Sequence, residues 1–177
     1  MSGGLLLDHT GRPVIDYGGK PQLVIPSILD SLRGIGIVLA GFSDAVEKKV
    51  LDHLTGKTAY TSPAPLYLAL CTSAVADTDT SASLVEANYT GYARLQIPAA
   101  DWNAASGTAA AATNANQKLF AACTGGTSTI IGWALTPIST TGGAGDVVMF
   151  GTCTSTVIST TQTPATVNAG ALSISLD

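Results

Sequence analysis

The stretch Leu66-Tyr67-Leu68-Ala69-Leu70-Cys71 is the part of this sequence that decides the fold. It follows two prolines and ends at a segment rich in Thr, Ser and Asp, and its run of apolar residues is typical of a core β-strand. At a period of two, the three leucines share one face, while Tyr67, Ala69 and Cys71 share the other. Both faces are apolar, so we expect a strand that is covered on both sides.

The chain after this stretch continues as short strand candidates separated by Gly-rich turns. The segment 92–97 alternates, which predicts Leu95 and Ile97 inward and Arg94 and Gln96 outward. Many short strands with almost no helix predict a mainly β fold, with a β-sandwich or jelly-roll-like body over residues 58–177. The other strand candidates are 118–123, 130–135, 147–150 and 171–176. The expected core residues are Leu66, Leu68, Leu70, Leu95, Ile97, Phe120, Trp133, Phe150, Leu172 and Ile174.

Residues 43–57 predict the one convincing helix of the chain. Ser43 is a good N-cap residue, acidic residues fill the first turn, and Gly56 supplies a C-terminal stop. Apolar side chains recur at helical spacing, so we expect one face of the helix to pack against the body. This face consists of Val46, Val50, Leu51 and Leu54.

Residues 1–42 mix glycines, prolines and short apolar clusters without a lasting helical or strand period. We interpret them as an extended N-terminal arm. Such an arm buries too little apolar surface to be ordered alone in water, so it should order against the body, a sister subunit or a larger assembly. The partner-binding side chains that we predict in it are Val14, Leu23, Ile25, Leu29 and Ile37.

Charged residues make up only 11% of the 177 residues, against about 25% in an average protein. Such a neutral exterior suits a protein that is largely covered by its neighbours. The net charge of −4 argues against nucleic acid as a partner, because binding it requires concentrated Lys and Arg. The sequence shows no signal peptide, and the apolar run 35–42 is too short to cross a membrane, so we predict no membrane partner and synthesis in a reducing compartment.

No motif for catalysis, metal binding or cofactor binding emerges from the sequence. His9 and His53 are the two histidines, and they lie on different predicted elements, so neither a metal site nor a catalytic triad can be assembled. The three cysteines are far apart and fit small buried apolar residues. We therefore predict a protein that is not an enzyme and has no metal ion and no cofactor.

An acidic loop and two tryptophans could each form a binding site or have only a structural role. Asp77, Asp79 and Glu86 loosely resemble a calcium loop, but the required Gly and final Glu are missing, so we predict a solvated acidic loop. Trp102 and Trp133 would suit a carbohydrate platform, yet such residues are more often anchors of a core or an interface.

Several segments resemble a family of small virion proteins of tailed bacteriophages, of tail-fibre or decoration type. The resemblance spans about residues 44–177 and rests on strand and turn patterns. The matching segments are Leu54-Thr-Gly56, Pro65 to Leu70, Glu86 followed by Gly91-Tyr-Ala-Arg94, Asn114 to Phe120, Val167-Asn168-Ala-Gly170 and the closing Ala-Leu-Ser-Ile-Ser-Leu-Asp.

The resemblance implies a non-enzymatic structural protein of a tailed-phage virion, made in the cytoplasm of the bacterial host. We predict a capsid decoration or cement protein that clamps the shell through its arm, with the phage capsid protein as its partner and a homotrimer as its assembly. The alternative is a tail-fibre or baseplate component that contacts the host surface, with tail or baseplate proteins as partners.

Overall fold

The computed structural model describes residues 37–107 and 110–175, with side chains from residue 41 onward, and every structural statement below concerns this part of the chain. All of it belongs to one compact unit. The predicted arm residues Val14, Leu23, Ile25 and Leu29 lie outside the described residues, and their role stays a prediction.

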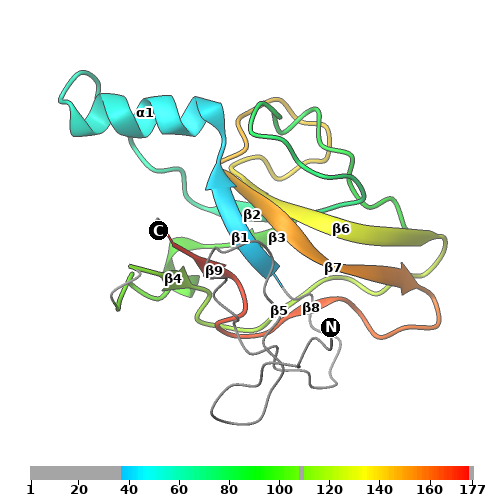
Figure 1. Ribbon diagram of the computed structural model, residues 1–177. Helices are drawn as coiled ribbons and strands as arrows, with labels where there is room; N and C mark the ends of the chain where they lie inside the picture. Colours follow the sequence, from blue (N-terminus) through cyan, green and yellow to red (C-terminus); the bar gives the residue numbers. More distant parts are fainter. Residues whose placement is uncertain (1–36, 108–109, 176–177) are drawn as a thin grey trace, which may run out of the picture. The chain divides into compact units, whose positions relative to one another are not determined.

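The centre of the fold is a five-stranded antiparallel sheet with the strand order β1-β7-β6-β2-β3 (Figure 1). Its longest strands form the β6-β7 hairpin. The strands predicted at 130–135 and 147–150 overlap these two strands but are shorter than they are. The strands are β1 (Ile37–Phe42), β2 (Leu66–Cys71), β3 (Leu95–Ile97), β6 (Thr127–Thr136) and β7 (Met149–Ser159).

Strand β1 changes the predicted boundary of the arm. Residues 37–42 were expected to end an extended arm, but they pair with β7, and Ile37 lies opposite Cys153. An apolar strand next to the long β7 satisfies backbone hydrogen bonds that an arm in solvent would leave to water. Ile37, predicted to bind a partner, is therefore the first residue of a body strand.

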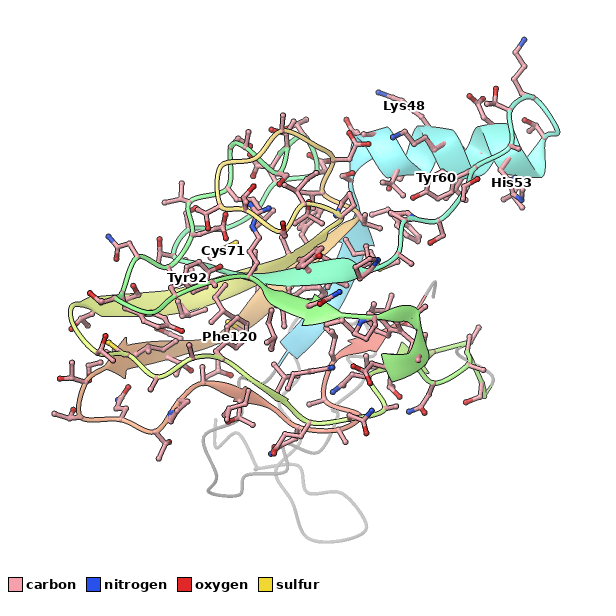
Figure 2. All side chains as sticks on the ribbon, turned by 180° about the vertical axis from the view of Figure 1, so that it is seen from behind. Lys48, His53, Tyr60, Cys71, Tyr92 and Phe120 are labelled. Atoms are coloured by element: carbon pink, nitrogen blue, oxygen red, sulfur yellow. The ribbon has the colours of Figure 1, made fainter. Side chains whose placement is uncertain are left out.

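Strand β2 is covered on both sides, as its sequence predicts. Leu68 and Leu70 belong to the large core cluster, whereas Ala69 and Cys71 belong to a second buried cluster with Ala134 and others. Figure 2 shows Cys71 and Phe120 on opposite sides of this strand. All ten predicted core residues are buried or pack against one of these two clusters.

Two short ladders contribute side chains to the large cluster. One pairs β4 (Ala112–Thr113) with β9 (Ser173–Ile174), and the other pairs β5 (Lys118–Leu119) with β8 (Thr166–Val167). Phe120, Val167 and Leu172 from these segments pack in one cluster with Trp133 of β6. The mainly β prediction is confirmed, but the described strands contain one large sheet and two small ladders, so a sandwich of two large sheets is not confirmed.

The predicted helix is α1 (Asp44–Leu54), and a short 3-10 helix, η1 (Ala99–Asp101), follows β3. Ser43 occupies the N-cap of α1, but its side chain donates to the carbonyl of Val147 instead of capping the helix. Gly56 follows the helix with a φ of 73°, a left-handed conformation that favours glycine at a helix end.

Candidate functional site

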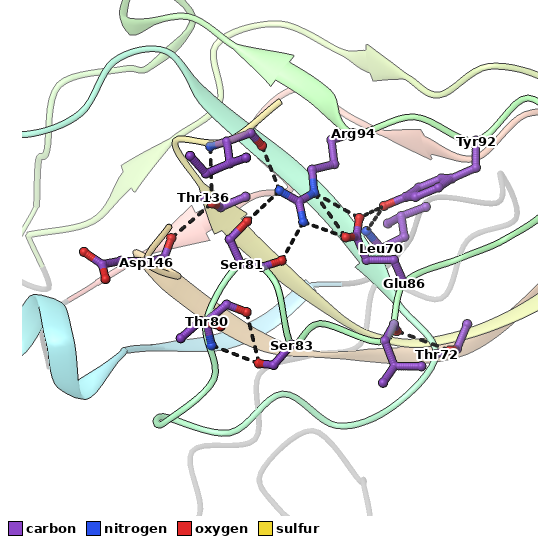
Figure 3. A network of polar contacts seen from close by, with 12 residues as sticks. Leu70, Thr72, Thr80, Ser81, Ser83, Glu86, Tyr92, Arg94, Thr136 and Asp146 are labelled. Atoms are coloured by element: carbon purple, nitrogen blue, oxygen red, sulfur yellow. Dashed lines mark hydrogen bonds and ion pairs between the residues drawn. The ribbon is translucent and has the colours of Figure 1, made fainter. Parts of the chain in front are cut away.

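The most connected polar group of the described body is the Arg94 guanidinium, which was predicted to point outward. Its side chain is fully buried, and it forms a salt bridge with the equally buried Glu86, with 2.6 Å between Nη2 and Oε1. Arg94 Nη1 donates to Ser81 Oγ at 2.7 Å and to the carbonyl of Ile138 at 2.8 Å, and Nη2 donates to the carbonyl of Ser81 at 2.9 Å (Figure 3). The outward prediction for Arg94 was wrong because Arg94 lies just before β3, where Ser81 and Ile138 from two loops enclose its side chain.

Glu86 was expected in a solvated acidic loop, and this prediction was also wrong. The second oxygen of its carboxylate accepts a hydrogen bond from Tyr92 Oη at 2.7 Å, and that hydroxyl accepts the backbone N–H of Leu70 at 3.0 Å. Burial first, and then the Glu86 carboxylate, raises the pKa of Tyr92 above its usual range. Tyr92 therefore stays a neutral donor, and every buried side-chain N or O atom of the described residues has a partner.

This charged centre holds two long loops against the sheet. The loop 72–94 contributes Ser81, Glu86 and Tyr92, and the loop 137–148 contributes Ile138. The loops also meet directly, because the N–H of Ser81 donates to the carbonyl of Gly145 at 2.8 Å. The arrangement binds backbone and side chains of the chain itself, so its role is to position loops.

The base of α1 is attached to the same two loops. The N–H of Asp44 donates to the carbonyl of Asp77 at 3.0 Å, and Lys49 forms an ion pair with Asp146. Val46 is buried, so the first turn of the helix packs as predicted.

The outer half of α1 does not pack as predicted. Leu51 is 61% exposed and Leu54 is 75% exposed. The returning segment lies along a different side of the helix, where the N–H of Tyr60 donates to His53 Nδ1 at 3.2 Å. Figure 2 shows Lys48 and His53 on the helix that projects from the body, with Tyr60 beside it. The helix therefore presents two leucines that no described element buries.

A second polar centre surrounds the buried side chain of Asn114. Its Nδ2 donates to the carbonyls of Asn116 and Asn168, both at 2.8 Å, and its Oδ1 accepts the N–H of Leu172 at 2.8 Å. One neutral amide thus joins the β4-β5 segment to the turn before β9. Two of the segments that carry the family resemblance, Asn114 to Phe120 and Val167 to Gly170, meet here.

The two tryptophans have different environments. Trp133 is completely buried, and its Nε1 donates to the carbonyl of Thr152 at 3.2 Å, so it is a core anchor. Trp102 is partly exposed and lines a half-open cleft of about 250 Å³ with Pro63, Leu66 and Ile97. Only Trp102 of this pair is placed to contact a partner.

The thiol of Cys71 and the possible metal-ligating side chains of the described residues do not form a reaction centre. Burial raises the pKa of Cys71 to about 12, so its thiol is not an activated nucleophile. Within the described residues, no group of three or more His, Cys, Asp or Glu side chains is placed to hold a metal ion. The helices of this part of the chain include none that is long and apolar enough to cross a membrane.

The fold and its two polar centres define a mainly β protein whose buried polar groups position loops. The chain belongs to the family described as Podophage GP4 fiber I protein gp80, whose family model matches residues 41–175. This match confirms the resemblance to tailed-phage virion structural proteins of tail-fibre type and supports a structural role in the virion. No curated protein matches the chain.

Proposed function

We propose that this protein is a non-enzymatic structural component of a phage tail fibre or baseplate that contacts the host surface. The family match over residues 41–175 carries the proposal, because it covers α1 and nearly the whole described body. This is the alternative that the sequence also predicts. Capsid decoration, the first prediction from the sequence, receives no support from a family of fibre proteins.

The location can be tested by counting copies in separated particle fractions. Quantitative mass spectrometry of tail-containing particles and of tail-less heads, with the major capsid protein as the internal reference, measures the copy number in each. We expect a copy number far below that of the capsid protein and loss of the protein from tail-less heads. A copy number near that of the capsid protein on heads without tails would overturn the proposal in favour of decoration.

Host contact belongs to the same proposal, and the Trp102 cleft is its candidate site. A partly exposed indole beside Pro63 offers an apolar face for stacking, whereas the buried Trp133 does not. Glycan-array binding by the full chain should be lost in Trp102→Ala and kept in Leu119→Ala, which truncates an exposed side chain elsewhere on the body. Equal binding by both variants would exclude this cleft as the contact site.

The arm is proposed to anchor the protein to its neighbours in the virion, either further copies in a homotrimer or tail and baseplate proteins. Its apolar clusters and balanced charge, with three basic and three acidic residues in 1–42, support this role. Deletion of residues 1–36 should remove the protein from particles while the body still folds. Unchanged incorporation of the deletion variant would refute the anchoring role.

A further inference from the structure

An open cleft lies between α1 and the segment 55–65 that returns from the helix to β2, and we call it the α1 cleft. Its volume of about 320 Å³ is within the range that is typical of small-molecule sites. Figure 2 shows Tyr60 of the returning segment beside the helix that carries Lys48 and His53. The cleft is lined by Lys49, Asp52, Thr58, Ala59, Tyr60 and Thr61. Five of these six side chains can form hydrogen bonds, so the cleft suits a polar ligand.

The two walls of the α1 cleft are joined by hydrogen bonds. The N–H groups of Lys57 and Thr58 donate to the carbonyl of Asp52 at 2.8 and 3.1 Å. The N–H of Tyr60 donates to His53 Nδ1 at 3.2 Å. These bonds hold the returning segment against the helix. The cleft is therefore formed before a ligand arrives, which lowers the entropic cost of binding.

The polar side chains that line the α1 cleft are available to a ligand. The Asp52 carboxylate forms no ion pair or hydrogen bond with another described residue, and neither do the hydroxyl groups of the lining Thr and Tyr residues. By contrast, the Asp101 carboxylate elsewhere on the body accepts from both Asn116 and Lys118. The donors and acceptors of the α1 cleft therefore remain free to bind groups from outside the body.

The charges of the α1 cleft favour a ligand that is neutral and rich in hydroxyl groups. An ionised carboxylate such as that of Asp52 only accepts hydrogen bonds, whereas an ammonium group such as that of Lys49 only donates them. A hydroxyl group does both, so a sugar residue can bind both side chains. An acidic ligand is disfavoured, because Asp146 already neutralises Lys49 and the negative charge of Asp52 remains.

The α1 cleft adjoins the Trp102 cleft along the returning segment. Thr61 lines the first cleft and Ser62 lines the second. Together the two clefts are lined by every residue from 58 to 66 except Pro65. A chain molecule that is bound at Trp102 therefore has its neighbouring units close to the α1 cleft.

We propose that the α1 cleft binds a neutral sugar residue of the same glycan chain that stacks on Trp102. This inference rests on the host contact proposed above and specifies its ligand as an uncharged glycan that spans both clefts. Asp52 accepts hydrogen bonds from the sugar hydroxyl groups, Lys49 donates to them, and the ring of Tyr60 contacts the apolar face of the sugar. Because both clefts hold one chain, a long fragment binds more tightly than a short fragment that fills one cleft.

Titration calorimetry of the full chain with bacterial glycan fragments tests this proposal. The fragments are selected on a glycan array that carries neutral and acidic chains of several lengths. We expect binding of neutral fragments, with higher affinity for longer chains than for disaccharides. Asp52→Ala should weaken binding of the longer chains about tenfold, because a hydrogen bond to a charged group is lost. Glu47→Ala is the matched control, since it removes an exposed carboxylate of the same helix outside the cleft, and it should bind like the wild type.

The outcomes separate this inference from the host contact on which it rests. Binding that is lost in Trp102→Ala but unchanged in Asp52→Ala would overturn the role of the α1 cleft and leave the host contact standing. A preference for acidic fragments, or equal affinity for long and short fragments, would also overturn it. A wild type that binds no fragment would refute the host contact and this inference together. Circular dichroism shows whether each variant is folded.

Discussion

The two buried polar centres of the body both hold irregular segments in place, but they use different chemical groups. The Glu86 and Arg94 centre uses a full ion pair, whereas the Asn114 centre uses one neutral amide. Both centres join segments that are distant in sequence, because Arg94 reaches Ile138, 44 positions away, and Asn114 reaches Asn168 and Leu172, 54 and 58 positions away. They differ in what they hold: the ion pair fixes two loops against the sheet, whereas the amide joins the β4-β5 segment to the turn before β9.

The two centres also differ in what their burial costs. Transferring two charges out of water is expensive, and the cost is offset only when the partners and the surrounding hydrogen bonds are all present. A neutral amide loses less hydration and needs fewer partners. Removing one partner should therefore lower the free energy of unfolding more in the charged centre than in the neutral one.

The largest effect is expected for Arg94→Met. This change leaves the Glu86 carboxylate buried without its cation, so the free energy of unfolding should fall by about 3–5 kcal/mol. Urea denaturation followed by circular dichroism measures the loss. The double variant Glu86→Leu/Arg94→Met should recover part of it, and a double variant as unstable as the sum of both single changes would show that the two charges are not energetically coupled.

A smaller loss is expected for Asn114→Ala. The change removes three hydrogen bonds and leaves the N–H of Leu172 and two carbonyls in the interior, which should cost about 1–3 kcal/mol. The same denaturation assay measures it. Asn103→Ala is the control, because Asn103 is exposed and donates only to Thr113, and its effect should stay within about 0.5 kcal/mol. A greater loss for Asn114→Ala than for Arg94→Met would reverse the ranking of the two centres.

Ser43→Ala removes the hydrogen bond between the base of α1 and the Val147 carbonyl in loop 137–148, and this loss should cost about 1 kcal/mol. Hydrogen exchange should show faster opening of α1, with β2 unchanged. Equal acceleration in both elements would mean that Ser43 supports the whole body and not the helix base in particular.

The smallest effect concerns the partly shielded pair of Asp101 and Lys118. Its hydrogen bond from Lys118, and then one from Asn116, lowers the pKa of Asp101. A lowered folded-state pKa stabilises the fold above the unfolded value of about 3.9 and loses this contribution as the pH falls through the folded-state value. The stability difference between wild type and Asp101→Asn should thus be present at pH 7 and shrink in strong acid. A difference that grows on acidification would contradict this assignment.

The core of the fold was predictable because apolar periodicity reports burial directly. The alternation in residues 66–71 predicted two covered faces, and the structure assigns these faces to two clusters. The outer part of β7 was missed because Thr, Cys and Ser in 151–156 give no apolar alternation, although Thr favours strands.

The charged centre could not be found from the sequence for a physical reason. Arg94 and Gln96 are two positions apart, so strand alternation predicts the same face for both polar side chains. Arg94 is nevertheless buried, whereas Gln96 is exposed. What distinguishes them is the path of loop 72–94, which no local pattern encodes. A signal was available in the combination of Glu86, Tyr92 and Arg94 within nine residues of a weakly charged chain, since isolated opposite charges there are candidates for a pair.

The pairing of β1 with β7 has a consequence for synthesis of the protein. Ile37 must find Cys153, so the first strand of the sheet waits until 116 more residues (153 minus 37) have been translated. At roughly 5–20 residues per second this interval is about 6–23 s, long on the scale of strand pairing. During that time the apolar sequence Ile-Val-Leu-Ala-Gly-Phe has no partner strand. During synthesis the nascent chain therefore exposes an unpaired apolar strand that is prone to aggregation. The folding yield then depends on how well the host cell protects this strand from other chains.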